Sequence, residues 1–216
     1  MTMDTCWRHI PAARNSYAAL YAACEKGGYT LRPVDSPQGD VTCYSLNSLN
    51  AHRFIPEIRR APCVTIAGGP HATACPAELS SVADYVVVGE GEYTLPSLLA
   101  SIEKECAPPP GVATSAGYRK ADTCVRLDAY PAFSQMKGYI EISRGCPHSC
   151  MYCQTPRIFG RGMRHRSIDA IAREARRFRD ARFVTPNALA YGSDGVHPRP
   201  DRVRALLSAL RDPRRK

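Results

Sequence analysis

The most informative segment of this chain is Tyr139-Ile-Glu-Ile-Ser-Arg-Gly-Cys-Pro-His-Ser-Cys-Met-Tyr-Cys153. Residues 139–143 are predicted to form a β-strand that runs directly into a group of three cysteines. Cys146, Cys150 and Cys153 have the spacing C-x3-C-x2-C, whereas the other seven of the ten cysteines are scattered singly. In a reducing compartment, cysteines are either core residues or ligands for soft metals. The grouping therefore predicts a metal centre where the strand ends.

The spacing favours an iron–sulfur cluster over zinc. Three thiolates on one tight loop can bind three irons of a [4Fe–4S] cubane and leave the fourth iron open to a small molecule. Structural zinc needs four closed ligands, commonly from two separate C-x2-C pairs, and this chain has one such pair. His148, as a fourth ligand from inside the same loop, would be strained. Gly145 and Pro147 make a chance group of buried cysteines a poor explanation.

An alternation of strands and helices continues after the cysteines. Ser167 is expected to cap a helix with an apolar stripe, and residues 182–185 are the next expected strand. A second helix is marked by Val203, Leu206, Leu207 and Leu210. Two βα units cannot close a barrel, so we expect the sequence to be cut short, with a natural small protein as the alternative.

The N-terminal half predicts a doubly wound α/β domain over residues 1–105. Short apolar runs are expected as strands at residues 7–10, 29–34, 41–46, 63–67 and 84–88. Helices are expected at residues 16–26 and 54–60 and after the fifth strand. Residues 106–138, with three consecutive prolines at 108–110, are predicted as a linker before the barrel-like part at 139–216.

Two glycine-rich elements follow expected strands: Ala67-Gly-Gly-Pro-His71 and Val88-Gly-Glu-Gly-Glu92. Glycine lets the backbone approach a ligand closely, and open α/β sheets bind ligands at the carboxyl ends of their strands. Either element alone would be an ordinary tight turn. Together they predict a binding edge.

The cysteine segment resembles the signature of the radical SAM superfamily, C-x3-C-x-Φ-C with Φ aromatic, here Tyr152. This resemblance implies a partial TIM barrel and a [4Fe–4S] cluster held by the three cysteines. It also implies S-adenosylmethionine, split by one electron from a donor such as ferredoxin or flavodoxin into methionine and a 5′-deoxyadenosyl radical. It places Tyr152 beside the adenine, and Asn187 and Ser193 are the expected further S-adenosylmethionine contacts. The arginines after the loop and His165 are candidates for binding the carboxylate of S-adenosylmethionine or an anionic substrate.

The N-terminal half resembles the Rossmann-like cobalamin-binding domain that precedes many radical SAM barrels. The resemblance implies cobalamin and either methyl transfer or rearrangement. It also implies a cobalamin site from Ser45, Gly68, Gly69, Pro70, His71, Gly89, Glu90, Gly91 and Glu92. Domains that supply a lower axial histidine carry Asp-x-His-x-x-Gly after the first strand. Residues 11–17 contain no histidine, so cobalamin would lack that ligand here.

Two other functions are open. A methylthiotransferase acting on tRNA or a ribosomal protein would hold a second cluster at Cys6, Cys43 and Cys75. The third interpretation is an inactive fragment or a non-enzymatic binding module.

Charge and composition set further expectations. Residues 139–216 hold 17 Lys/Arg and 7 Asp/Glu, against 12 and 13 in residues 1–138. Such asymmetry can mark a nucleic-acid partner, but a solvated arginine-rich face with an anionic cofactor explains it better. The sequence has no apolar run long enough to span a membrane and no secretion signal at its start, which predicts a cytoplasmic location.

Overall fold

The computed structural model describes residues 3–121, 124–130 and 139–211. The chain divides into two compact units, Met1–Val125 and Arg126–Lys216. Each unit has its own apolar core.

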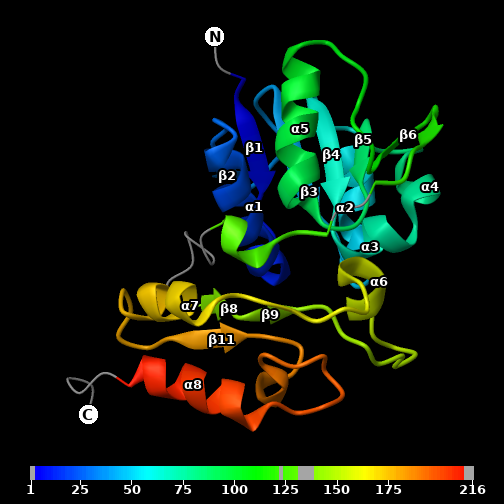
Figure 1. The fold of residues 1–216 in the computed structure, drawn as a ribbon. Coiled ribbons are helices and arrows are strands. Elements are labelled where there is room, and N and C mark those ends of the chain that lie inside the picture. The colour runs from blue at the N-terminus through cyan, green and yellow to red at the C-terminus, as the bar shows by residue number, and fades with distance from the viewer. Residues whose placement is uncertain (1–2, 122–123, 131–138, 212–216) are drawn as a thin grey trace. The chain divides into compact units, whose positions relative to one another are not determined.

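The N-terminal unit is built on a seven-stranded sheet with the order β2-β1-β3-β4-β5-β6-β7 (Figure 1). The first five strands in this order are parallel, and β6 and β7 are antiparallel. The order 2-1-3-4-5 is that of an open doubly wound fold, so the predicted fold class is confirmed. The strands are β1 Thr5–Arg8, β2 Arg32–Val34, β3 Val41–Ser45, β4 Val64–Gly68, β5 Tyr85–Val87, β6 Val112–Thr114 and β7 Gly117–Tyr118.

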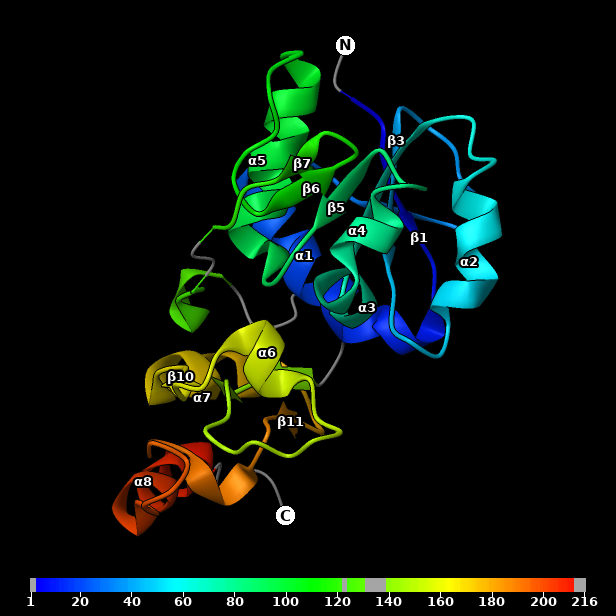
Figure 2. The same cartoon turned by 90° about the vertical axis from the view of Figure 1, so that its right-hand side faces the viewer.

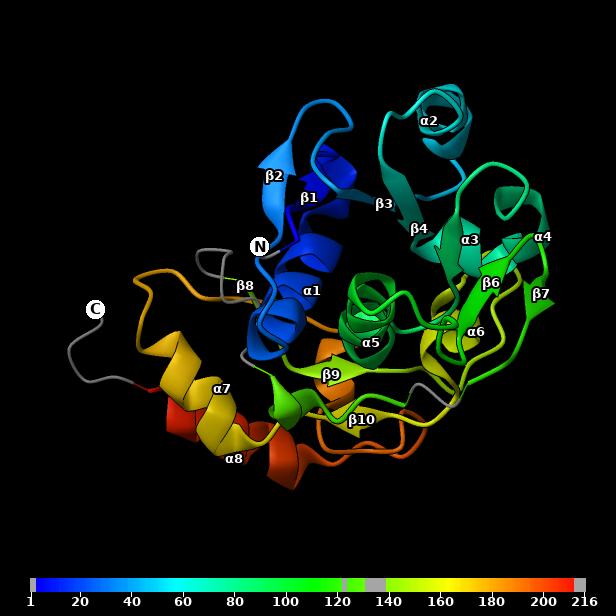
Figure 3. The ribbon, with the colours of Figure 1, turned by 90° about the horizontal axis from the view of Figure 1, so that it is seen from above.

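Helices cover both faces of this sheet. Figure 3 shows α1 (Arg14–Lys26) and α5 (Gly91–Glu103) on one face and α2 (Ala51–Ile58) on the other. Two short helices, α3 (Pro70–Ala74) and α4 (Pro76–Leu79), follow β4. The core between these layers consists of fully buried apolar side chains, among them Leu31, Tyr44, Leu46, Ile66, Leu98 and Leu99.

The hairpin β6–β7 lies in the segment that the sequence predicted as a linker (Figure 2). Val112 pairs with Val87, and Ala113 pairs with Val86. Val112 and Ala113 are buried because they extend the hydrophobic surface of the sheet by one strand. A strand of three residues is too short to show a period in the sequence, so only pairing with β5 identifies it.

Element boundaries elsewhere differ from the predictions by a few residues. The first strand begins at Thr5 rather than Trp7, because Thr5 and Cys6 are buried while His9 is exposed. The second strand is confined to Arg32–Val34. Helix α2 begins at Ala51, before the predicted start at residue 54.

The C-terminal unit contains a small parallel sheet of β8 (Tyr139–Glu141) and β11 (Arg182–Val184). Helix α7 (Ile168–Ala175) connects these strands, and α8 (Pro200–Leu210) follows β11 and contacts α7 (Figure 1). Ser167 caps α7 as predicted, since its Oγ accepts a hydrogen bond from Ala170 N at 3.3 Å. The core is formed by Ile140, Ile142, Ile171, Ala175, Tyr191 and Leu206. Two βα units are therefore present, as the sequence indicated.

Within the described residues, no helix is both long enough and apolar enough to cross a membrane.

Candidate functional site

The cysteine loop is anchored where it leaves the strand. Strand β9 (Ser143–Arg144) leads into it and pairs antiparallel with β10 (Arg164–His165), so the chain returns beside its own start. Cys146 N donates to Gly160 O at 3.2 Å. Gly145 has φ +89°, and a Cβ there would overlap the carbonyl oxygen of Gly162. Only glycine fits at this crossing, which positions the first cysteine.

The three cysteines of this loop are free thiols. Cys150 is exposed, and Cys146 and Cys153 are half-buried. Cys153 N donates to Cys150 O at 3.0 Å. Hydrogen bonds from the side chain and backbone of Thr155 lower the pKa of Cys153, which favours the thiolate that binds metal.

A buried ion pair fixes the residue that precedes Gly145. Arg144 Nε and an Nη donate to the two carboxylate oxygens of Glu141, at 2.8 and 2.7 Å. Both side chains are largely buried. The Arg144 guanidinium also lies over the ring of Phe159, 5.0 Å from its centroid. Phe159 ends helix α6 (Thr155–Phe159), so the pair connects the strand before the loop to the helix after it.

The arginines after the loop bind mostly to the protein itself. Arg161 donates to Ser149 Oγ at 2.6 Å, and Arg164 donates to Phe159 O at 2.7 Å. Arg166 donates to the carbonyl oxygens of Glu141 and Tyr130, at 3.0 and 2.7 Å. Burial lowers the pKa of Arg166, an effect that Glu141 and Asp128 oppose. These side chains support the loop rather than present free charge to a ligand.

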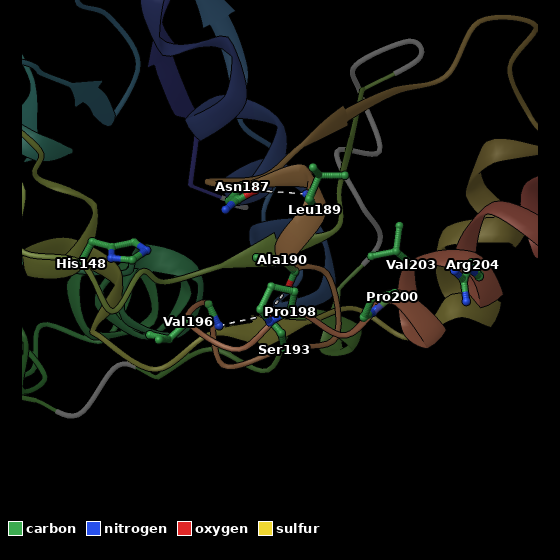
Figure 4. Close-up of a pocket in the computed structure, with 11 residues that line it drawn as sticks. His148, Asn187, Leu189, Ala190, Ser193, Val196, Pro198, Pro200, Val203 and Arg204 are labelled. Atoms are coloured by element: carbon green, nitrogen blue, oxygen red, sulfur yellow. Dashed lines mark hydrogen bonds between the residues drawn. The ribbon is translucent and has the colours of Figure 1, made fainter.

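A cavity of about 550 Å³ lies between the cysteine loop and α8. Figure 4 shows His148 from the loop on one side and Val203 and Arg204 from α8 on the other. The segment between β11 and α8 forms the rest of the wall, through Asn187, Leu189, Ala190, Ser193, Gly195, Val196 and Pro198. This volume lies within the range usual for pockets that hold small molecules and cofactors.

The structure brings two of the three expected S-adenosylmethionine contacts to this cavity. Asn187 and Ser193 line it, whereas Tyr152 is 89% exposed and is not part of the wall. Ser193 Oγ donates to Ala190 O at 2.8 Å and accepts from Gly195 N at 3.0 Å, so it shapes the wall. Asn187 Oδ1 accepts from Leu189 N at 3.1 Å. Their contact with a ligand stays a prediction.

Sequence reasoning missed Arg204 as a cavity residue. The pattern of Val203, Leu206 and Leu210 predicts a helix that packs on a core, and α8 does so through Leu206. Nothing in that pattern shows that the first turns of the same helix line a cavity. His165 is a further supporting residue, because it holds the segment around Ser193 by two hydrogen bonds.

The glycine-rich elements of the N-terminal unit meet at the carboxyl edge of the sheet, as predicted. Ser45 pairs with Gly68 at the ends of β3 and β4, and Leu46 O accepts from His71 N at 3.0 Å. Gly69 has φ +94°, and a Cβ there would lie 2.7 Å from Leu46 O. Glycine at 69 is thus required by the protein's own backbone.

Thr73 joins the first glycine-rich element to the second. Its Oγ1 donates to Gly69 O at 3.0 Å and accepts from Gly89 N at 3.0 Å. Glu90 and Glu92 are 4% and 6% exposed, and Glu90 Oε2 accepts from Val125 N at 2.9 Å. The sequence predicted these two glutamates as ligand contacts. In the structure both side chains are buried, and their role toward a ligand stays a prediction.

The carboxyl edge between β1 and β3 is the place where the strand order reverses, and open α/β sheets bind cofactors at such a point. His9, which follows β1 directly, is exposed there. Sequence reasoning passed over His9 because it lies before the segment compared with the axial-histidine motif. Binding of a cofactor at this edge stays a prediction.

Cys6, Cys43 and Cys75 do not face one another, so they do not form a site for a second cluster. Cys43 pairs with Trp7 and Cys6 pairs with Thr42, so the Cys6 and Cys43 side chains point to opposite faces of the sheet. Burial raises the pKa of Cys43 well above its ordinary value, which disfavours the thiolate. Cys75 lies between α3 and α4, beyond the end of β4. The three thiols therefore cannot bind one cluster in this fold.

Comparison with known proteins identifies a family match in the C-terminal unit and several relatives that extend across much of the chain. Residues 140–215 match the radical SAM superfamily. Hopanoid C-3 methylase of Methylococcus capsulatus is 29% identical, over 74% of this chain and 36% of its own length. Bacteriochlorophyllide d C-12(1)-methyltransferase of Chlorobaculum tepidum is 26% identical, over 86% of this chain and 42% of its own length. The chain thus spans less than half of each of these relatives.

A solved structure shares the fold of nearly the whole chain. The radical S-adenosylmethionine methyltransferase TsrM from Kitasatospora setae, with cobalamin and a [4Fe–4S] cluster bound, superimposes with a TM-score of 0.69. The alignment covers 96% of this chain and 50% of that one, at 17% sequence identity. At this identity the similarity is one of fold.

Proposed function

We propose that this chain, whose residues 140–215 match the radical SAM superfamily, supplies the cofactor-binding part of a cobalamin-dependent radical SAM methyltransferase. The observation that carries the proposal is the anchored loop of Cys146, Cys150 and Cys153 beside a cavity of about 550 Å³. The N-terminal sheet with its glycine-rich edge, the two methylating relatives and the fold of TsrM support it. Rearrangement of the substrate is the alternative reaction.

The three thiolates would hold a [4Fe–4S] cluster, which when bound supplies the electron that cleaves S-adenosylmethionine. Gly145 and the Arg144–Glu141 pair orient the loop, and the Thr155 hydrogen bonds keep Cys153 in its ligand form. The cavity would take S-adenosylmethionine. Asn187 offers amide hydrogen bonds at its rim, and Arg204 offers a cation for the carboxylate. Tyr152, next to Cys153 and freely exposed, is available to contact the adenine.

The carboxyl edge of the N-terminal sheet would hold cobalamin. Ser45 and the turn of Gly68 and Gly69 lie at this edge, at the ends of β3 and β4. Pro70 starts helix α3 and fixes the direction of the chain as it leaves the turn. Cobalamin supplies a cobalt that carries the methyl group, and these residues would orient it.

The electron donor would be a small acidic protein such as a ferredoxin or flavodoxin, since residues 139–216 carry an excess of ten positive charges. Ten free thiols suit the reducing conditions of the cytoplasm.

Anaerobic reconstitution with iron and sulfide tests the proposal. We expect about four irons per chain, whereas a second cluster would give about eight. Added S-adenosylmethionine should change the electron paramagnetic resonance spectrum of the reduced cluster, and dithionite should yield 5′-deoxyadenosine. Hydroxocobalamin should stay bound after desalting.

Replacing Cys146, Cys150 and Cys153 together by serine should abolish iron binding and cleavage. Cys106→Ser is the matched control, because Cys106 is an exposed thiol far in sequence from the loop. A reconstituted protein without cluster absorbance, or an equal iron content in the triple variant, would rule the proposal out. A protein that cleaves S-adenosylmethionine but does not retain cobalamin would refute the cobalamin part alone.

A further inference from the structure

The N-terminal unit contains a group of metal-ligating side chains apart from the cysteine loop. His71, Cys75 and Glu78 each offer one ligand atom, and these atoms lie within 4.8 Å of one another. No other such group of three occurs among the described residues. The three residues belong to α3, to the junction after it, and to α4.

The local backbone places these three side chains on one face of the α3–α4 segment. Pro70 and Pro76 each start a short helix, and Cys75 is the residue between them. Cys75 N donates to His71 O at 2.8 Å, and Leu79 N donates to Cys75 O at 3.2 Å, which keeps the helical spacing across the junction. Positions i, i+4 and i+7 then share a face.

His71 provides the second observation. Its Nε2 atom is buried and has no hydrogen-bond partner in the described structure, and Glu78 Oε1 lies 4.0 Å away. A buried polar nitrogen without a partner is costly, so such a group in a native structure calls for an unseen ligand or ion. The His71 side chain is 14% exposed and that of Glu78 is 57% exposed, so the group opens to solvent on the glutamate side.

We propose that His71, Cys75 and Glu78 bind a divalent cation of the zinc type, with water or a small ligand in the fourth position. Imidazole nitrogen, thiolate and one carboxylate suit zinc. Magnesium and calcium prefer oxygen ligands, and an iron–sulfur cluster requires more thiolates. Ligand atoms on tetrahedral zinc lie about 3.3–3.8 Å apart, given bonds of about 2.0–2.3 Å. The Glu78 side chain is exposed, so its carboxylate can move closer to the other two ligand atoms and reach this spacing.

The ion would cross-link α3 to α4 next to the turn at Gly69, with His71 turned to the ion rather than to cobalamin. The site goes beyond the proposed function and does not depend on it, since it uses none of the cluster cysteines. It therefore predicts one metal ion per chain that survives removal of the iron–sulfur cluster.

Cobalt titration of the full chain tests the site, because Co²⁺ reports thiolate coordination by colour. The background carries Cys146→Ser, Cys150→Ser and Cys153→Ser, so that the cluster loop cannot compete. We expect saturation at one equivalent, with a thiolate-to-cobalt charge-transfer band, visible bands of a tetrahedral site, and displacement by Zn²⁺. Cys75→Ser should lose the charge-transfer band. His71→Ala and Glu78→Gln should weaken binding at least about tenfold, the lower limit for the loss of even an outer-shell partner.

Cys106→Ser in the same background is the control and should leave the titration unchanged, since Cys106 is an exposed thiol of the same unit. In a second measurement, Zn²⁺ should raise the thermal unfolding midpoint over that in EDTA, and this rise should vanish in Cys75→Ser. Circular dichroism of metal-free Cys75→Ser, matching that of the background, shows that the variant folds. An unchanged charge-transfer band in Cys75→Ser, or no saturable cobalt binding in the folded background, would overturn the proposal. Neither result bears on whether the chain binds the iron–sulfur cluster or cleaves S-adenosylmethionine.

Discussion

His165 Nε2 lies 2.7 Å from the carbonyl oxygen of Ser193, and the other ring nitrogen, Nδ1, lies 3.2 Å from the backbone N–H of Gly192. A backbone N–H can only donate and a carbonyl can only accept. His165 is therefore neutral, with its proton on Nε2. One imidazole thus holds two nearby peptide groups, through Gly192 N and Ser193 O, in the segment that lines the cavity.

Replacing His165 should loosen the cavity wall. His165→Phe keeps a ring beside Tyr191, whose ring is 5.4 Å away, but leaves the peptide groups at 192 and 193 without this partner. We expect the free energy of unfolding to fall by about 2 kcal/mol. The affinity for S-adenosylhomocysteine, measured by calorimetry, should fall about tenfold or more. His165→Gln retains a donor for Ser193 O and should recover part of both losses. Equal affinity in the Phe variant would contradict this role.

The pair of Arg144 and Glu141 should be sensitive to removal of one partner. Arg144→Met leaves a buried carboxylate without its cation, and we expect a loss of about 3–5 kcal/mol in urea unfolding. Changing both residues to methionine should cost much less than the sum of the single changes. Arg199→Met breaks an exposed pair with Asp201, at side-chain exposures of 56% and 59%, and should leave the free energy of unfolding almost unchanged because solvent screens this pair. Similar losses in Arg144→Met and Arg199→Met would argue against a supporting role for the buried pair.

Gly28 and Gly69 allow the cost of a strained backbone conformation to be measured apart from the cost of a steric clash. Gly28 has φ +87°, and a Cβ added there would meet no atom within 4 Å, whereas a Cβ at Gly69 (φ +94°) would lie 2.7 Å from Leu46 O. Gly28→Ala should cost about 1–2 kcal/mol from conformation alone. Gly69→Ala should cost more, because the backbone of Leu46 must also move. Fluorescence of the single tryptophan, Trp7, which is buried in the same unit, measures both. Equal losses would show that the turn at Gly69 relaxes freely.

The stability of the segment before α8 should depend on pH through the pair of Asp194 and His197. Hydrogen bonding with Asp194 raises the pKa of His197 above the ordinary 6.5, and the same bond lowers the pKa of Asp194. The stabilisation from charged His197 is present below pH 6.5 and is lost as the pH rises through the raised value. Asp194→Asn should return the pKa of His197 toward 6.5 in an NMR titration of its ring. An unchanged titration would show that the pair does not form in solution.

Cobalamin, if it binds at the sheet edge, should lack an imidazole ligand below the cobalt. Residues 11–17 contain no histidine, so the Co²⁺ state should show no nitrogen coupling in its electron paramagnetic resonance spectrum. His9 is the exposed imidazole at the end of β1. Nitrogen coupling that disappears in His9→Ala would contradict the prediction and would identify His9 as the ligand.

Features that depend on local chemistry could be predicted from the order of residues. The spacing of Cys146, Cys150 and Cys153, the cap at Ser167 and the order of most strands and helices follow from residue types close together in the chain. The meeting of the two glycine-rich elements was also predictable, because parallel strands end at the same edge of a sheet.

Features that depend on contacts between distant segments emerged only from the folded chain. The pairing of β6 with β5 turned part of the expected linker into sheet. The register of β1 and β3 placed Cys6 and Cys43 on opposite faces. Packing of α8 brought Arg204 to the cavity opposite His148. Each outcome is set by which long-range contacts bury the most apolar surface, and a residue's neighbours in the chain do not carry that information.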